Sequence, residues 1–94
     1  MKAPVRRVVT QRLGHAYPVY DRGYAAHLDA MDQWLSGFDG LLTFGRQGLF
    51  AHDNTHHALT MAYAAADCLE LDGRFDRALW SRYRRDFESH VVED

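Results

Sequence analysis

The spacing of apolar residues changes along the chain, and the first part favours extended backbone. Residues 5–13 (VRRVVTQRL) carry β-branched residues between polar flanks, a pattern typical of a strand with one face in water. Residues 16–20 (AYPVY) form a second extended segment, because Pro18 fixes its own φ and biases Tyr17 away from helical backbone. Pro18 also argues against a central, fully paired strand.

A helical period begins at residue 24. One stripe of apolar residues then recurs every three or four positions, as in an amphipathic helix: Tyr24, Leu28, Met31, Leu35 and Phe38. Asp21 is a suitable cap before this helix, and Gly37 is a suitable stop after it. The pattern therefore predicts an amphipathic helix between these two residues.

Two more helices are expected in the second half of the chain. Residues 55–69 are good helix formers with apolar side chains on nearly every face, which indicates a mostly buried helix that Asp72 and Gly73 end. A last helix, over about residues 75–88, places its large apolar side chains on one face: Phe75, Leu79, Trp80, Tyr83 and Phe87. His90 and the tail VVED are expected to fray.

The short apolar run at residues 41–44, bounded by glycines, is typical of a strand buried on both faces. Together with the extended segments near the N-terminus, it predicts an α+β fold with two or three short strands and about three helices. A chain of 94 residues with 47% hydrophobic content is expected to form one domain, residues 1–94.

Composition narrows the possible partners. A formal net charge of −2, with 26% of residues charged, gives no electrostatic case for binding nucleic acid or an anionic membrane surface. There is no run of about 18 apolar residues and no signal-peptide pattern, so the sequence predicts a cytoplasmic protein without a membrane span. The single cysteine, Cys68, lies among alanines and leucines and is expected to be a small buried hydrophobe.

The chemistry of the sequence is concentrated in a glycine turn before the second helix. Gly45 and Gly48 permit a sharp bend and a close approach of a ligand to the backbone. Arg46 between them can present a forked donor to a phosphate, and the following helix start offers unpaired N–H groups. The alternative is a tight turn with a surface arginine that binds nothing.

A polar cluster follows the turn: His52, Asp53, Asn54, His56 and His57. His52 and His56 are four residues apart and would share a helical face, as metal ligands often do. Asp53 and Asn54 are good helix caps, however, so the helix should begin near Thr55 and leave His52 outside it. No metal is therefore predicted, although a site of His52, His56 and His57 stays an alternative. A histidine acting as acid or base also stays open, but no paired nucleophile identifies a catalytic residue.

In this order, the motifs resemble the C-terminal flavin-binding segment of the FAD-dependent amine-oxidoreductase superfamily, especially its protoporphyrinogen-oxidase-like and UDP-galactopyranose-mutase-like members. That family has Gly-Arg-x-Gly, an aromatic residue and Tyr-x-Asn/Asp-Met before a helix that ends under the isoalloxazine ring. Here the corresponding residues are Gly45-Arg46-Gln47-Gly48-Leu49-Phe50 and His52-Asp53-Asn54-Thr55-His56-His57. AYPVYDRGY is similar to the family's Tyr-Pro-x-Tyr segment. The resemblance covers about residues 5–71.

The resemblance implies FAD as cofactor and a fold like the C-terminal part of a FAD-binding Rossmann-like domain. It places Arg46 near the pyrophosphate or ribityl chain, Asn54 near the ribityl or flavin edge, and the N–H groups of Thr55 and His56 at the pyrimidine oxygen. The implied FAD-binding residues are Gly45, Arg46, Gly48, Asn54, Thr55 and His56. The sequence departs from the family pattern at His52, where tyrosine is usual, and at Thr55, where methionine is usual.

The glycine-rich dinucleotide fingerprint that holds the adenosine half of FAD is missing from this sequence. We therefore expect a fragment of a larger flavoprotein that is inactive alone and works with an N-terminal FAD-domain chain. Two alternatives stay open: a small self-associating interaction domain that keeps the fold without cofactor, and the metal-binding protein described above. A homo-oligomer is expected, because a short apolar strand and an apolar helix need neighbours.

Overall fold

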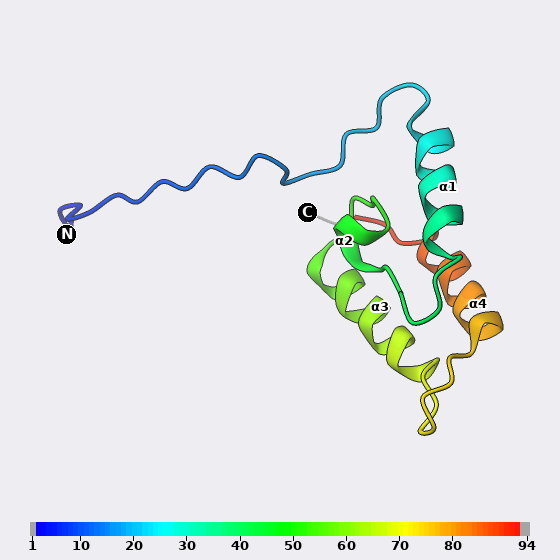
Figure 1. The fold of residues 1–94 in the computed structure, drawn as a ribbon. Helices are drawn as coiled ribbons and strands as arrows, with labels where there is room; N and C mark the ends of the chain where they lie inside the picture. The colour runs from blue at the N-terminus through cyan, green and yellow to red at the C-terminus, as the bar shows by residue number, and fades with distance from the viewer. Residues whose placement is uncertain (1, 93–94) are drawn as a thin grey trace.

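The computed structural model describes residues 2–92, and Figure 1 shows their arrangement. Within that range the helices are α1 (Tyr24–Leu35), α2 (Gly45–Gly48), α3 (Thr55–Asp67) and α4 (Arg77–Phe87). The helices form one body, and the N-terminal arm, defined here as residues 2–15, extends away from it (Figure 1). This arm raises the radius of gyration to 17.8 Å, compared with about 12 Å expected for a compact domain of this length.

The predicted α+β class, with its resemblance to part of a Rossmann-like domain, is wrong for residues 2–92. Residues 5–13 are extended, and residues 41–44 are irregular, but neither segment pairs with a neighbour in a sheet. The strand-type pairing in the described chain is an isolated antiparallel bridge between Leu69 and Phe75. Alternating or continuous apolar residues favour extended backbone, whereas a sheet also requires a neighbouring strand to take up the N–H and C=O groups.

Helix α1 forms where the spacing of apolar residues predicts a helix, but it begins and ends at residues other than the expected ones. Gly23 is the N-cap, at a φ of 86°, in place of the expected Asp21. The helix ends at Leu35, so Phe38 lies beyond it and packs edge-on against Trp34, with the ring centroids 4.7 Å apart. Met31, a member of the predicted stripe, is 62% exposed, so the stripe of α1 meets the rest of the body only in part.

The hydrophobic core lies between α3 and α4. Its buried members are Met61, Ala64, Ala65, Cys68, Trp80 and Phe87. Partly buried residues of α4, and of the segment just before it, pack against these buried residues. This packing confirms the predicted apolar face of the last helix. Cys68 is fully buried, as expected. Burial raises the pKa of the Cys68 thiol, and the negative charges of Asp76 and Asp67 raise it further, so the cysteine stays protonated.

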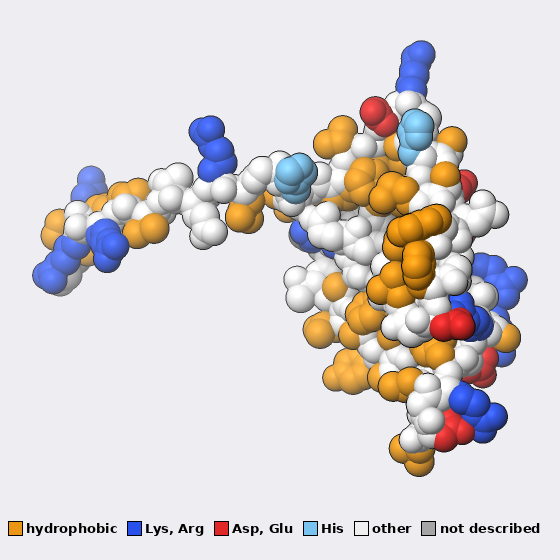
Figure 2. Space-filling view, viewed as in Figure 1, with side chains coloured by type: hydrophobic (Ala, Val, Ile, Leu, Met, Phe, Trp, Pro, Cys, Tyr) orange, Lys and Arg blue, Asp and Glu red, His pale blue; other side chains and the backbone are white. Residues whose placement is uncertain are grey.

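Helix α3 is less buried than its composition predicts. It buries one face, with Met61 and Ala64 against α4, while Leu59 is 56% exposed and Tyr63 is 74% exposed. The helix thus has an apolar outer face that no described residue covers. Hydrophobic side chains are also visible along the arm and over much of the body in Figure 2. None of the described helices is long and apolar enough to cross a membrane.

Candidate functional site

The first glycine of the Gly-Arg-x-Gly turn is required by its backbone conformation. The turn is the short helix α2, and Gly45 begins it at a φ of 83°, a backbone conformation that favours glycine. The N–H of Gly45 donates to the Met61 sulfur at 3.2 Å, which fastens the turn to α3. A Cβ on Gly48 would lie 3.4 Å from the Thr43 carbonyl carbon, an ordinary van der Waals contact, so space alone does not require glycine at this position.

Arg46 points into the loop. Its Nε donates to the backbone carbonyl of Asp53 at 3.0 Å, and Nη2 donates to the same oxygen. The guanidinium also lies over the Tyr17 ring, 5.1 Å from the centroid. Arg46 therefore holds together the turn, the residue before the N-cap of α3 and the N-terminal segment. A guanidinium has five N–H donors, so a phosphate contact would have to use the donors left over.

The Tyr-Pro-x-Tyr segment docks on this same loop. The Tyr20 hydroxyl donates to the Phe50 carbonyl at 2.9 Å and accepts the His52 N–H at 3.0 Å. The His52 ring nitrogen Nε2 contacts the Pro18 carbonyl at 2.7 Å, and Pro18 is buried. The Tyr20 ring stacks on Tyr24, with centroids 4.7 Å apart. Two segments about thirty residues apart thus form one hydrogen-bonded unit, which the sequence pattern did not specify.

The start of α3 follows the predicted capping chemistry. Asn54 is the N-cap, and its side chain accepts the N–H of His57 while His57 Nδ1 accepts the N–H of Asn54 at 3.1 Å. Helix α3 begins at Thr55, as expected. Thr55 and His56 are exposed, and N–H groups in a first helical turn have no partner within the helix. These are the donors that the resemblance assigns to the flavin.

The six predicted FAD-binding residues therefore fall into two adjacent groups. Gly45, Arg46 and Gly48 form the turn, which packs on α3, and the remaining three lie at the start of α3. Arg46 and the Asn54 side chain already have partners within the chain. The groups at the surface that are best suited to an external ligand are the backbone donors of Thr55 and His56.

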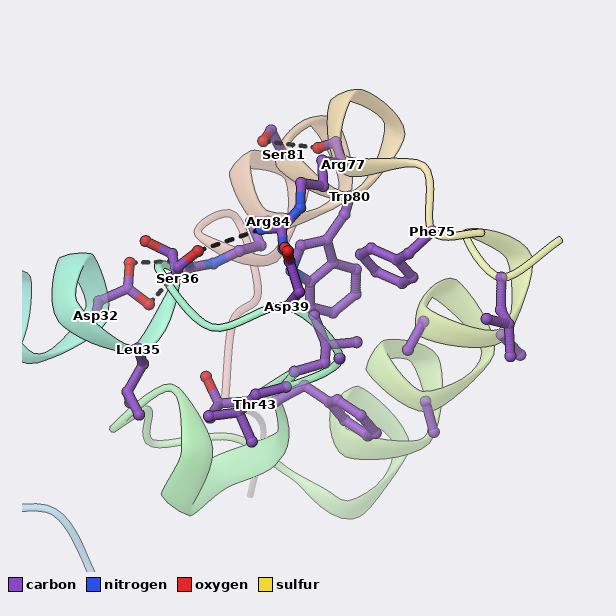
Figure 3. Close-up of a pocket in the computed structure, with 18 of the residues that line it drawn as sticks. Asp32, Leu35, Ser36, Asp39, Thr43, Phe75, Arg77, Trp80, Ser81 and Arg84 are labelled. Atoms are coloured by element: carbon purple, nitrogen blue, oxygen red, sulfur yellow. Dashed lines mark hydrogen bonds and ion pairs between the residues drawn. The ribbon is translucent and has the colours of Figure 1, made fainter. Parts of the chain in front are cut away.

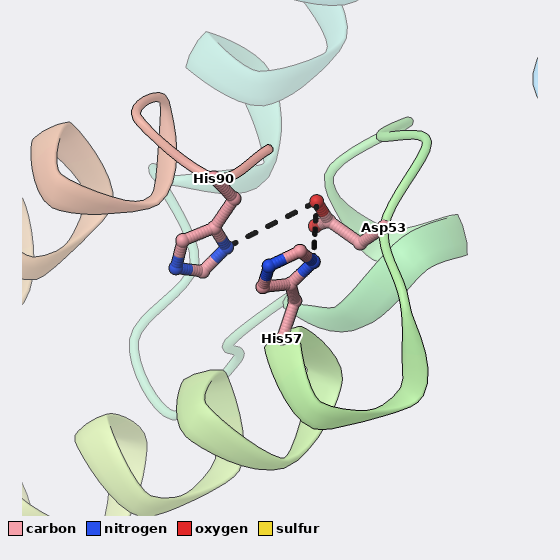
Figure 4. Close-up of side chains that lie close together, drawn as sticks. All are labelled: Asp53, His57 and His90. Carbon is pink, nitrogen blue, oxygen red and sulfur yellow. Dashed lines mark ion pairs between the residues drawn. The ribbon is translucent and has the colours of Figure 1, made fainter. Parts of the chain in front are cut away.

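A cluster of side chains of the kind that bind metals lies at the first turn of α3, but it is not the set of His52, His56 and His57 that stayed an alternative. Asp53, His57 and His90 approach one another, as Figure 4 shows. His52 and His56 do not belong to the cluster, because His52 turns toward Pro18. No sequence pattern points to His90, which comes from the far end of the chain. Instead of fraying, His90 stacks on His57, with ring centroids 4.3 Å apart; residues 93–94 lie outside the described range.

A groove of about 830 Å³ runs between α1, residues 39–44, α3 and α4. Figure 3 shows Trp80 and Phe75 side by side in it, and two ion pairs at its edge. Arg84 binds Asp32 at 2.8 Å, and Arg77 binds Asp39 at 3.0 Å. The groove is apolar in its interior, and its charged side chains are paired, so it presents no charged group aimed at a small polar ligand.

No family model matches the chain, and neither a curated protein nor a solved structure matches it.

Proposed function

We propose that this chain is the flavin-facing C-terminal segment of an FAD-dependent oxidoreductase of the amine-oxidase and protoporphyrinogen-oxidase-like kind, incomplete and inactive alone. The observation that carries the proposal is the hydrogen-bonded unit formed by its two resembling motifs. Tyr20 joins Phe50 and His52, and Arg46 reaches from the glycine turn to Tyr17. Segments that cooperate in one site are expected to be held together in this way.

The first turn of α3 supplies the chemistry of this half-site. FAD, when bound, would supply hydride transfer, and its reduced form carries negative charge on the pyrimidine part of the ring. The N–H groups of Thr55 and His56 would donate to that part, and the positive end of the helix dipole favours negative charge there by about 0.3–1 kcal/mol. Asn54 acts by fixing where the helix begins, since its side chain caps α3.

The missing half of the site would come from a partner. A chain or segment with the dinucleotide fingerprint would hold the adenosine half of FAD and cover apolar side chains that are exposed here, including Leu59 and Tyr63 on α3. This partner is a protein, because the dinucleotide fingerprint is a polypeptide motif. A cytoplasmic location stays a prediction from the sequence.

The proposal is tested by reconstitution. The chain is co-expressed with candidate N-terminal chains that carry the fingerprint, and the complexes are purified and examined for flavin absorption. A yellow complex is expected. Thr55→Pro is the decisive variant, because proline at the first helical position removes one N–H while it suits the helix start. The Asn54 backbone, at φ −77° and ψ 167°, already has the conformation preferred before proline.

Thr55→Ala is the matched control, since alanine removes the side chain and keeps the N–H. Loss of one hydrogen bond of about 1–1.5 kcal/mol should weaken FAD binding by the proline variant about tenfold relative to the alanine variant. A complex that never binds FAD, or equal FAD affinity of the two variants, would count against the proposal.

A second function, self-association through the N-terminal arm, is favoured by one observation. The arm extends away from the body. Its large apolar residues are each exposed over two thirds or more of their surface: Val5, Val8, Val9 and Leu13. An exposed apolar segment of this kind is typical of an interaction surface.

A further inference from the structure

Three side chains of the kind that bind transition metals meet beneath the first turn of α3. Asp53 lies just before the helix, His57 is in its first turn, and His90 follows α4. Asp53 Oδ1 is 3.6 Å from His57 Nδ1 and 3.9 Å from His90 Nδ1. One ligand atom from each residue lies within 4.8 Å of the others. Figure 4 shows both imidazole rings next to the Asp53 carboxylate, each joined to it by a dashed line.

Burial makes this arrangement costly as it stands. Asp53 and His57 are each 7% exposed, and His90 is partly buried. Asp53 Oδ2 and His90 Nδ1 are buried atoms without a hydrogen-bond partner. Arg46 donates to the Asp53 backbone carbonyl, so it does not compensate the carboxylate. A buried carboxylate with an unpartnered oxygen requires a compensating positive charge.

The separations suit a shared metal ion better than direct hydrogen bonds. Distances of 3.6 Å and 3.9 Å between Asp53 Oδ1 and the two imidazole nitrogens exceed the usual range for an N–H···O bond. Two ligand atoms on one tetrahedral zinc ion, each bonded at about 2.0–2.1 Å, lie about 3.4 Å apart. An inward movement of the side chains would reach these separations. The His57 and His90 rings, which are stacked 13° from parallel, would also have to rotate so that both Nδ1 lone pairs point at the ion.

We propose that Asp53, His57 and His90 form a binding site for a divalent transition-metal ion, with Zn²⁺ as the best match. Two imidazole nitrogens and one carboxylate oxygen are a borderline donor set that suits zinc, whereas Mg²⁺ and Ca²⁺ prefer oxygen ligands throughout. Three protein ligands leave a fourth tetrahedral position for water. The site is separate from the backbone donors assigned to flavin above.

Metal binding through His57 has a local cost. Its Nδ1 accepts the N–H of Asn54 at 3.1 Å, and coordination at this nitrogen would take the same lone pair. The N-terminal end of α3 also opposes a cation, although the Asp53 carboxylate offsets that charge. One neutral hydrogen bond is weak compared with a metal–ligand bond. Metal binding should therefore release the Asn54 amide, which then exchanges faster with solvent.

The test is a titration of the full 94-residue chain with Zn²⁺ by calorimetry, and with Co²⁺ by visible absorption as a probe of tetrahedral geometry. One ion per chain is expected. Asp53→Asn and His90→Ala should each weaken Zn²⁺ binding by more than about tenfold, since loss of even an outer-shell partner costs a zinc site about 10–100-fold. His15→Ala and His27→Ala, at exposed histidines outside the cluster, should bind like the wild type.

Circular dichroism verifies that each variant is folded. If Asp53→Asn unfolds, His90→Ala alone tests the metal site, because His90 lies outside the helices. Faster hydrogen exchange of the Asn54 amide on adding Zn²⁺ supports coordination through His57. The site is overturned if the wild type binds Zn²⁺ no more tightly than His90→Ala, or if the His15 and His27 variants lose as much affinity. Neither outcome bears on flavin binding, which the reconstitution measures without zinc.

Discussion

Gly45 has the backbone conformation on which the candidate flavin turn depends. Its φ of 83° lies in the left-handed region, where any other L-residue brings Cβ close to its own backbone. Space is not the constraint, because no atom outside the adjoining backbone lies within 4 Å of the position that a Cβ would take. The requirement for glycine is therefore conformational.

Gly45→Ala should destabilise the chain by about 1–2 kcal/mol, the usual cost of the left-handed conformation for a residue with Cβ. Urea unfolding followed by circular dichroism measures this change. Gly14→Ala is the matched control, because Gly14 has no positive φ and no close neighbour, and it should stay within about 0.5 kcal/mol of the wild type. Equal stability of the two variants would show that the turn does not need the glycine.

Single residues also show which parts of the candidate site can be predicted from sequence. The start of α3 at Thr55 was predicted, because capping by Asn54 acts over three residues. The partners of Arg46 and the position of His90 were not, since both depend on residues brought together by folding. Residue type indicates what a side chain is able to bind, whereas its partner depends on the tertiary structure.

At the scale of elements, the prediction of α4 is confirmed and the predicted strands are wrong, for the same physical reason. A stripe of Trp80, Tyr83 and Phe87 is a local property of a helix with 3.6 residues per turn, and Asp76 caps its start by accepting the Leu79 N–H at 2.9 Å. A strand at residues 41–44 would need a partner strand from elsewhere. Between residues 2 and 92 no segment supplies one, so that run stays irregular.

A hydrogen bond between helices predicts a pH dependence of stability. Tyr83 on α4 donates to Asp67 Oδ2 at the end of α3, at 3.0 Å, and this bond, with desolvation, raises the pKa of the Tyr83 hydroxyl. The folded chain thus holds that proton more tightly than the unfolded chain does. The stability it contributes is fully present below the ordinary tyrosine pKa of about 10 and is lost as the pH rises through the higher folded-state pKa.

Wild-type stability should therefore fall more steeply than that of Tyr83→Phe above about pH 10, because phenylalanine has no proton to lose. Urea midpoints measured from neutral to alkaline pH give this comparison. Tyr63→Phe, a change at an exposed tyrosine of α3, should keep the wild-type profile. Parallel profiles for the wild type and Tyr83→Phe would mean that the bond to Asp67 does not contribute in solution.

At the scale of the whole molecule, the distribution of charge is uneven. The arm carries Lys2, Arg6, Arg7 and Arg12 and no acidic residue, so its charge is +4. The whole chain has a net charge of −2, which leaves −6 on the rest. The arm also exposes apolar residues and lies away from the body. Opposite charges and apolar surface together favour docking of the arm of one copy on the body of another.

Arm-mediated self-association should depend on salt, because the Debye screening length falls from about 10 Å at 0.1 M ionic strength to about 3 Å at 1 M. Sedimentation velocity at low salt is expected to show an oligomer that dissociates as salt is added. Arg6→Glu should shift the oligomer toward monomer, since it turns an attraction to the acidic body into repulsion. Arg82→Glu makes the same charge change on an exposed residue of α4 and should leave the oligomer intact. A monomer under all these conditions, or equal dissociation by both variants, would rule out the arm as the contact.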